Sequence, residues 1–222
     1  MNNLRLRLTA LLLRRRGKDA FVMALGRGAH LFDIGCGNDS PARVAALRSD
    51  LHYVGLDVGD YNLSETSKAK ANEYIVCTPD AFAQTIRNYP GQVDAIVSAH
   101  NLEHCNDYTE VVNAMASVLA PQGSIYIAFP CRESVSFPRR AGTLNFYDDP
   151  THRHLVDSAQ VIAALESHGL KAEFVSQRYR PILLAALGLL LEPISWLTKR
   201  NMPLASTWAL YGFETVIWAR KV

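Results

Sequence analysis

The sequence is poor in cysteine, in net charge and in long apolar runs. Its four cysteines lie far apart and form no Cys-x-x-Cys pair, which favours a reducing cytoplasm over a disulfide framework or a zinc site. A formal net charge of +2 is too small to indicate a nucleic-acid partner. The longest apolar stretch, 182–191, is about half the length of a membrane span. We therefore expect a cytoplasmic protein that at most lies against a membrane surface.

The sequence contains alternating strand and helix patterns over the length of a single domain. The 222 residues, 49% of them hydrophobic, are enough for one full-sized core. Strands and helices alternate after residue 30, which predicts an α/β fold with a doubly wound, mainly parallel sheet. We expect an N-terminal helical extension (1–25), a core (30–178), an apolar helical insertion (180–211) and a closing strand (212–222). Pro193 is expected to break the insertion's helix after about three turns.

A glycine turn follows the first predicted strand. Leu31-Phe32-Asp33-Ile34 runs into Gly35-Cys36-Gly37, and the next strand ends at Asp57. Two glycines let the backbone turn sharply and approach a ligand closely. A carboxylate at the end of the following strand is placed to accept hydrogen bonds from both hydroxyls of a ribose. The pattern therefore predicts a nucleoside site at the carboxyl edge of the sheet.

The residues around this turn argue against a dinucleotide. The dinucleotide fingerprint needs a third glycine where this chain has Ser40. We expect Ser40 instead to cap the helix that begins with Pro41. Asp33 before the glycines and Asp39 within the turn would repel a pyrophosphate. A nicotinamide-dependent oxidoreductase is therefore the less favoured alternative.

At these residues the sequence resembles the class I S-adenosylmethionine-dependent methyltransferases, whose first motif reads acid, apolar residue, Gly-x-Gly. The segment Ser98-Ala99-His100-Asn101-Leu102-Glu103-His104 resembles the motif after the fourth strand in the type 11-like subfamily, which ends in Leu-Glu-His. The resemblance implies a Rossmann-like seven-stranded sheet with an antiparallel last strand, and an enzyme that uses S-adenosylmethionine. A binding module without methyl transfer is the competing class. The implied cofactor contacts are Asp33, Gly35, Cys36, Gly37, Asp57, Val58, Asp80, Ala81, Ser98, His100 and Asn101.

Three histidines are candidates for catalysis. His100 should face the transferred methyl group, because the carboxyl end of a central strand is where ligands sit in such sheets. His104 is either a base near neutral pH or a structural hydrogen-bonding residue, and His152 is a second candidate base. With Asp149, His152 and His154 could suggest a metal site, but two histidines in a hydrated loop are too few ligands to indicate one. We therefore expect no metal.

The long segment 130–155 is predicted to bind the acceptor, because a loop of this length in a compact domain is usually functional. Its mixture of polar and aromatic residues suits a hydroxylated small molecule or saccharide, and we favour a glycan or lipid-linked sugar. The alternation of leucine and arginine over 4–16, together with the apolar segment 182–197, could form a basic and apolar face that contacts anionic lipid. Burial of 182–197 against the sheet or in a homodimer is favoured. The candidate acceptor-binding residues are Glu133, Arg139, Asn145, Tyr147, Asp149 and His152.

Overall fold

The computed structural model describes residues 8, 12–89 and 92–222, and these residues form a seven-stranded sheet in the order β3-β2-β1-β4-β5-β7-β6. All neighbouring strands are parallel except β7, which runs antiparallel to both β5 and β6. This confirms the predicted Rossmann-like sheet. The strands are β1 (His30–Ile34), β2 (His52–Asp57), β3 (Glu73–Val76), β4 (Val93–Ala99), β5 (Leu119–Pro130), β6 (Leu170–Ser176) and β7 (Glu214–Lys221).

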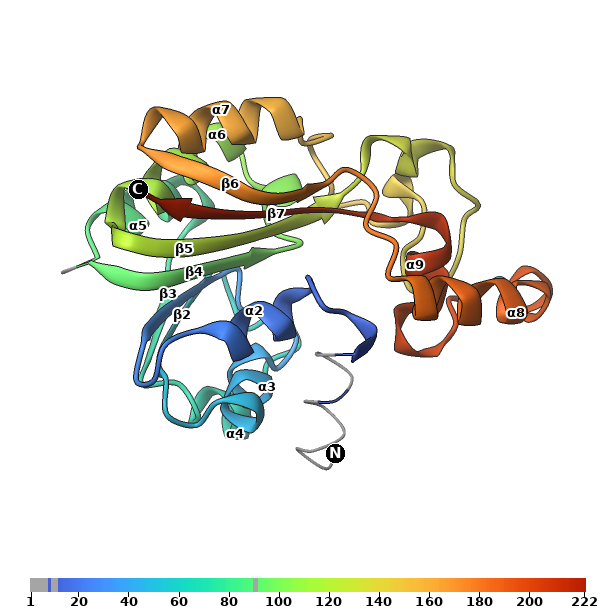
Figure 1. The fold of residues 1–222 in the computed structure, drawn as a ribbon, viewed down its shortest axis with the longest axis horizontal. Helices are drawn as coiled ribbons and strands as arrows, with labels where there is room; N and C mark the ends of the chain where they lie inside the picture. Colours follow the sequence, from blue (N-terminus) through green and yellow to red (C-terminus); the bar gives the residue numbers. More distant parts are fainter. Residues whose placement is uncertain (1–7, 9–11, 90–91) are drawn as a thin grey trace.

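Helices cover both faces of the sheet and create two separate cores (Figure 1). On one face α5 (Phe82–Arg87), α6 (Tyr108–Val118) and α7 (Ser158–Ser167) pack on the sheet. On the other face lie α2 (Lys18–Ala24) and α3 (Ser40–Leu47), with the short α4 (Glu65–Lys68) beside α3. Because both faces are buried, the inner strands are almost entirely apolar. Single turns of 3-10 helix, η2 to η6, are Pro79–Ala81, Leu102–His104, Arg132–Ser136, Phe146–Asp148 and Pro203–Ala205.

The predicted start of α3 is wrong by one residue. The N-cap of α3 is Asp39, in the left-handed region at φ 53°, and Ser40 is already helical. The Ser40 hydroxyl donates to Asp33 instead of capping. Asp80 does not cap α5, because a turn of 3-10 helix comes first and the N-cap is Ala81. Asp107 and Asp157 do cap α6 and α7, accepting from Glu110 N and Ala159 N.

The insertion between β6 and β7 forms two helices, α8 (Ile182–Thr198) and α9 (Ser206–Tyr211). They project beyond the carboxyl edge of the sheet, beside the long loop that follows β5 (Figure 1). Contrary to the prediction, α8 continues through Pro193, whose ring lies on an exposed side of the helix. Gly188 allows the close packing of α8 on α9, since a Cβ there would lie 2.2 Å from the carbonyl oxygen of Ser206.

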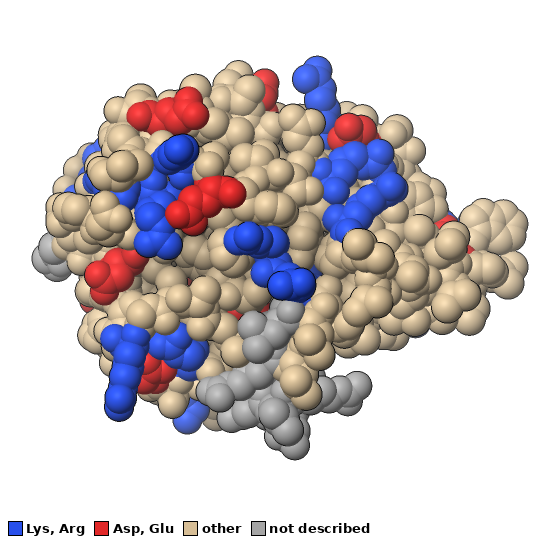
Figure 2. Space-filling model, viewed as in Figure 1, with Lys and Arg blue, Asp and Glu red and all other residues tan. Residues whose placement is uncertain are grey.

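The sheet domain does not bury 182–197, and the alternative, burial in a homodimer, stays a prediction. Only Leu184, Gly188 and Ser195 of α8 are buried. Figure 2 shows that the α8 projection carries few charged side chains on the face in view. In the part of the chain that the structure describes, no helix combines the length and apolarity needed to cross a membrane. The exposed apolar residues of α8 are Ile182, Leu183, Leu189, Leu190, Ile194, Trp196 and Leu197.

Candidate active site

The glycine turn between β1 and α3 is held between two other segments of the sheet edge. Gly35 has φ +79°, and a Cβ on it would lie 2.6 Å from the Asn101 Cβ, just after β4. A Cβ on Gly37 would lie 2.9 Å from the carbonyl oxygen of Tyr61, in the loop after β2. Both positions therefore need glycine, because any side chain would push away a neighbour that shapes the site.

Asp57 at the end of β2 faces this turn. Its Oδ1 accepts a hydrogen bond from the Val58 amide at 2.7 Å. Its Oδ2 lies 3.5 Å from the place where a Cβ on Gly37 would be. Burial raises the pKa of Asp57, an effect that backbone N–H groups oppose. A buried carboxylate beside a side-chain-free turn is the arrangement that ribose hydroxyls require.

Asp33 supports the turn from beneath. Its side chain is fully buried, and its carboxylate accepts hydrogen bonds from Lys18 at 3.0 Å, Ser40 at 2.5 Å and Tyr53 at 2.8 Å. Because these donors surround the carboxylate, the structure argues against direct cofactor contact by Asp33 and makes it a positioning residue. Cys36 is equally buried, and burial raises the pKa of its thiol, so it serves as a small apolar residue under the turn.

The remaining predicted cofactor residues lie along the same sheet edge. Val58 and Asp80 are exposed, and Ala81 is half-buried. Asp80 accepts a hydrogen bond from Asn106 Nδ2 at 2.8 Å, which joins the end of β3 to the segment after β4. Asn101 Nδ2 donates to the buried Ser98 hydroxyl at 3.4 Å. These side chains thus lie along one edge of the sheet, where β1 to β4 end.

Comparison with protein families agrees with this geometry. Residues 4–175 match the family model described as a methyltransferase domain. The chain belongs to this family. It is an S-adenosylmethionine-dependent methyltransferase, as the glycine turn and the Leu-Glu-His segment predicted.

Curated relatives are named as methyltransferases, and a solved structure shares the fold. The methyltransferase is 28% identical over 168 residues to a ubiquinone biosynthesis O-methyltransferase of Marinobacter nauticus, covering 70% of this chain and 69% of that protein. A similar enzyme of Xanthomonas euvesicatoria is 26% identical, covering 67% of this chain and 65% of its own length. A Haemonchus contortus phosphoethanolamine N-methyltransferase, solved with S-adenosylmethionine, shares the fold with TM-score 0.61 at 18% identity, covering 97% of this chain and 52% of that chain.

His100 lies between two carboxylates. Its Nδ1 is 3.2 Å from Glu103 Oε1, and its Nε2 is 3.1 Å from Glu214 Oε1 at the start of β7. Burial lowers the pKa of His100, but the hydrogen bonds and charges of the two glutamates outweigh it and raise the pKa to about 9. A histidine with both ring nitrogens engaged and a proton retained at neutral pH is no general base. This geometry argues against a base role for His100, and its expected place facing the transferred methyl group stays a prediction.

His104 and His152 lie together on the far side of Glu103. Their ring centroids are 4.9 Å apart. His152 Nδ1 lies 2.6 Å from the Phe146 carbonyl oxygen, and its Nε2 lies 3.9 Å from Glu103 Oε1. A proton on Nδ1, donated to that carbonyl, leaves the Nε2 lone pair available. The long loop thus brings its histidine to the segment after β4, as a reaction site at this edge requires.

The acceptor-binding candidates of the long loop divide into two groups. Asn145 is buried and its amide is used inside the loop, which argues against contact with an acceptor. Its Nδ2 donates to the carbonyl oxygens of Val135 and Phe137, and its Oδ1 accepts from Tyr147 N. Glu133, Arg139 and Tyr147 are exposed, and Asp149 is half-buried. Those four remain available to a ligand.

The sequence patterns missed residues that come from distant segments. Glu214 begins β7, and Lys18 comes from α2, yet they contact His100 and Asp33. Trp208 of α9 places its ring 5.1 Å from the His100 ring. The charged Glu214 directly before the apolar run of the closing strand was an available signal, since a buried charge needs a partner.

Proposed function

We propose that the methyltransferase transfers the methyl group of S-adenosylmethionine to a hydroxyl oxygen of a lipid-linked saccharide at a membrane surface. The observation that carries this proposal is the exposed apolar face of α8 beside the acceptor loop. Ile182, Leu190 and Leu197 are 84%, 77% and 72% exposed. An apolar helix face rimmed by basic residues is typical of proteins that rest on anionic lipid.

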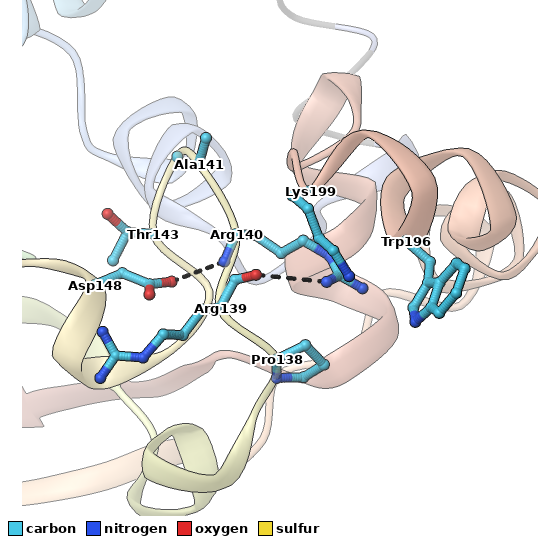
Figure 3. Close-up of a pocket in the computed structure, with 9 residues that line it drawn as sticks. Pro138, Arg139, Arg140, Ala141, Thr143, Asp148, Trp196 and Lys199 are labelled. Atoms are coloured by element: carbon cyan, nitrogen blue, oxygen red, sulfur yellow. Dashed lines mark hydrogen bonds between the residues drawn. The ribbon is translucent and has the colours of Figure 1, made fainter.

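Basic residues lie where that face meets the long loop. A cavity of about 690 Å³ opens between segment 138–148 and α8 (Figure 3). Arg139 and Lys199 line it with Trp196, and Lys199 Nζ lies 4.8 Å from the centre of the Trp196 ring. Arginine and lysine are the side chains that bind phosphate groups. A lipid carrier joined to its saccharide through phosphate fits a cavity of this composition.

Hydrogen bonds connect this cavity to the reaction site. Arg140 is buried between the loop and α8, where Nη2 donates to Glu192 at 3.1 Å and Nε to Ser195 at 3.3 Å. The indole of Trp208 donates to the Thr143 carbonyl oxygen at 2.6 Å, and the same indole contacts His100. An acceptor anchored at the cavity would therefore reach the methyl group along a surface that α8, α9 and the loop form together.

The chemistry asks little of the protein beyond alignment. The sulfonium already carries a good leaving group, so holding the acceptor oxygen in line with the methyl carbon supplies the largest gain. Asn101 beside the glycine turn would orient the methyl donor. The His152 Nε2, which faces Glu103, would accept the proton of the hydroxyl group as the carbon–oxygen bond forms.

The relatives favour a second candidate acceptor. Both curated relatives are named for oxygen methylation in ubiquinone biosynthesis. An aromatic hydroxyl group of an intermediate of that pathway is therefore the alternative substrate, and it would use the same reaction site.

An acceptor screen with labelled methyl separates these candidates. Purified enzyme is incubated with methyl-labelled S-adenosylmethionine and three pools: lipid-linked saccharides, demethylated ubiquinone intermediates and water-soluble hydroxylated metabolites. We expect label in the lipid-linked saccharide, released as a methylated sugar after acid hydrolysis. Label in the quinone pool or only in the soluble pool would overturn the proposed acceptor.

Vesicle binding tests the role of α8. The protein should sediment with vesicles of phosphatidylcholine and phosphatidylglycerol, and less with phosphatidylcholine alone. Leu190→Ser with Leu197→Ser should reduce this binding at least tenfold. Val222→Ser removes an equally exposed apolar side chain at the opposite end of the sheet and serves as the control. A dimer that hides α8, without vesicle binding, would contradict the membrane role.

A further inference from the structure

We propose that Glu103, His104 and His152, with Asp149 beside them, form a binding site for one divalent transition-metal ion. The first two residues belong to the 3-10 turn η3 after β4, and the other two come from the loop after β5. One ligand atom from each of Glu103, His104 and His152 lies within 4.8 Å of the other two. This departs from the expectation of no metal, which considered only the loop residues and not their position against Glu103.

The distances suit a bound ion. His152 Nε2 lies 3.9 Å from Glu103 Oε1 and 4.0 Å from Asp149 Oδ2. Metal bonds to nitrogen and oxygen are roughly 2.1 Å long, so two ligands on opposite sides of an ion are about 4.2 Å apart. These pairs already fall within that limit. The ligand atoms of Glu103, His104 and His152 lie within 4.8 Å of one another, and each would move inward by less than about 1 Å to bind one ion.

Glu103 provides the observation that points to a cation. Its side chain is fully buried, and Oε1 contacts His100. Among the described residues, its Oε2 is buried without a hydrogen-bond partner. A buried carboxylate oxygen without a partner costs free energy that a cation would offset. The loop is also fixed at this point, because the Glu103 carbonyl oxygen accepts from Arg153 N at 2.8 Å.

Both histidines are oriented as metal ligands usually are. A ligating histidine typically donates its second ring N–H to a carbonyl or carboxylate oxygen, which fixes the ring. His152 Nδ1 lies 2.6 Å from the Phe146 carbonyl oxygen. His104 Nδ1 lies 3.0 Å from Thr151 Oγ1, and that hydroxyl donates to Asp149 Oδ1 at 2.6 Å. One chain of contacts thus aligns two of the proposed ligands.

The ligand types select the class of metal. Two imidazoles with one or two carboxylates favour Zn²⁺, Mn²⁺, Fe²⁺ or Co²⁺ over Ca²⁺ and Mg²⁺. The binding of the ion stands independently of the acceptor, whereas its role rests on the proposed function. In the proposed reaction, an acceptor hydroxyl group would bind at the open coordination position of the ion. Binding to the ion lowers the pKa of that hydroxyl group.

With the ion bound, proton transfer no longer requires His152 as the base. The hydroxyl proton leaves to water, and a lone pair of the oxygen forms the new carbon–oxygen bond. The sulfur–methyl bond breaks with its electron pair on sulfur, so that S-adenosylhomocysteine leaves as a neutral thioether. Two adjacent hydroxyl groups, as saccharides carry, could both bind such an ion.

Calorimetric titration tests the site. Protein stripped with a chelator is titrated with ZnCl₂ and, separately, with MnCl₂. We expect one ion per chain, bound at least tenfold more weakly by His104→Ala, His152→Ala and Glu103→Gln. His168→Ala is the matched control, because His168 ends α7, outside the cluster. Circular dichroism checks the fold of each variant, and the partly exposed His104 supplies a variant that should fold even where Glu103→Gln does not.

The outcomes separate this inference from the proposed function. Binding that is equally strong in wild type, His104→Ala and His152→Ala, or no stoichiometric binding at all, overturns the metal site. If the ion binds as expected and no lipid-linked saccharide is methylated, the metal site stands and the proposed acceptor fails. S-adenosylmethionine affinity should stay within about twofold in His104→Ala, which places the ion on the acceptor side.

Discussion

The carboxylate of Glu214 on β7 lies 3.1 Å from Nε2 of His100, 114 positions earlier in the chain. Arg14 contacts the other oxygen of the same carboxylate. Burial alone raises the pKa of Glu214, but Arg14 and His100 outweigh it and lower the pKa to about 2. The Glu214 carboxylate at the start of β7 thus links Arg14 in the N-terminal segment to His100 in the segment after β4.

Glu214→Gln should make the protein less stable at neutral pH. Because the folded-state pKa is below the unfolded value, the ionised carboxylate contributes its stability above pH 4.5 and loses it as the pH falls towards 2. The wild type should exceed the variant by about 3 kcal/mol at pH 7. This difference should shrink between pH 4.5 and 2 in urea unfolding followed by fluorescence. Glu173→Gln, at an exposed ion pair with Arg220, is the control and should change stability by less than about 1 kcal/mol.

Gly35→Ala should damage both the fold and the cofactor site. Alanine at φ +79° is strained, and its Cβ would meet Asn101. We expect a loss of about 2 kcal/mol or more in unfolding free energy and much weaker S-adenosylmethionine binding. Gly26→Ala introduces the same methyl group where nothing lies within 4 Å, and should change stability by less than about 0.5 kcal/mol. Similar thermal unfolding of the two variants would contradict the packing described for the turn.

Asp57→Ala should lower S-adenosylmethionine affinity while the protein remains folded. Charge-assisted hydrogen bonds to the ribose contribute about 1.5–3 kcal/mol, which corresponds to a tenfold to hundredfold change in the dissociation constant. Calorimetric titration measures it. Asp60→Ala, in the following loop and paired with Lys68, is the matched control. If Asp57→Ala binds S-adenosylmethionine with wild-type affinity, the ribose does not bind at Asp57.

Gly188→Ala should destabilise the protein, although alanine favours helices more than glycine by about 1 kcal/mol. The added Cβ would lie 2.2 Å from the Ser206 carbonyl oxygen and must push α8 away from α9. Thermal unfolding and vesicle binding should both change. Ala186→Gly, at an exposed position of the same helix, should lose only the ordinary helix-propensity difference of about 1 kcal/mol. A Gly188→Ala variant more stable than wild type would show that the two helices separate freely.

Much of the sheet could be predicted because its strands are short apolar runs that end in recognisable polar residues. The run from Leu31 to Ile34 before the glycine turn was recognised as a strand, and the structure places β1 there, at His30–Ile34, with both faces buried. Strand ends that no such polar residue marks were predicted less accurately. β5 begins at Leu119, directly after α6, because Pro121 lies inside the strand and does not separate the two elements.

The site was harder to predict where it depends on contacts between distant segments. The glycine turn and Asp57 are local patterns with fixed spacing, so both could be recognised. The surroundings of His100 could not, since Glu214 and Trp208 approach it only after the sheet closes. The α8 helix shows the same limit: its pattern is apolar, but whether that face is covered depends on what packs against it.

The two ends of the insertion that carries α8 and α9 meet at the sheet. The segment leaves β6 after Ser176 and returns to β7 before Val216, and these two residues are partners in the antiparallel pair. A segment whose ends are neighbours can be shortened, lengthened or replaced without altering the strand register. A graft at this hairpin would therefore keep the strand register and the cofactor turn, but it would remove Trp208 and change the surface that faces His100.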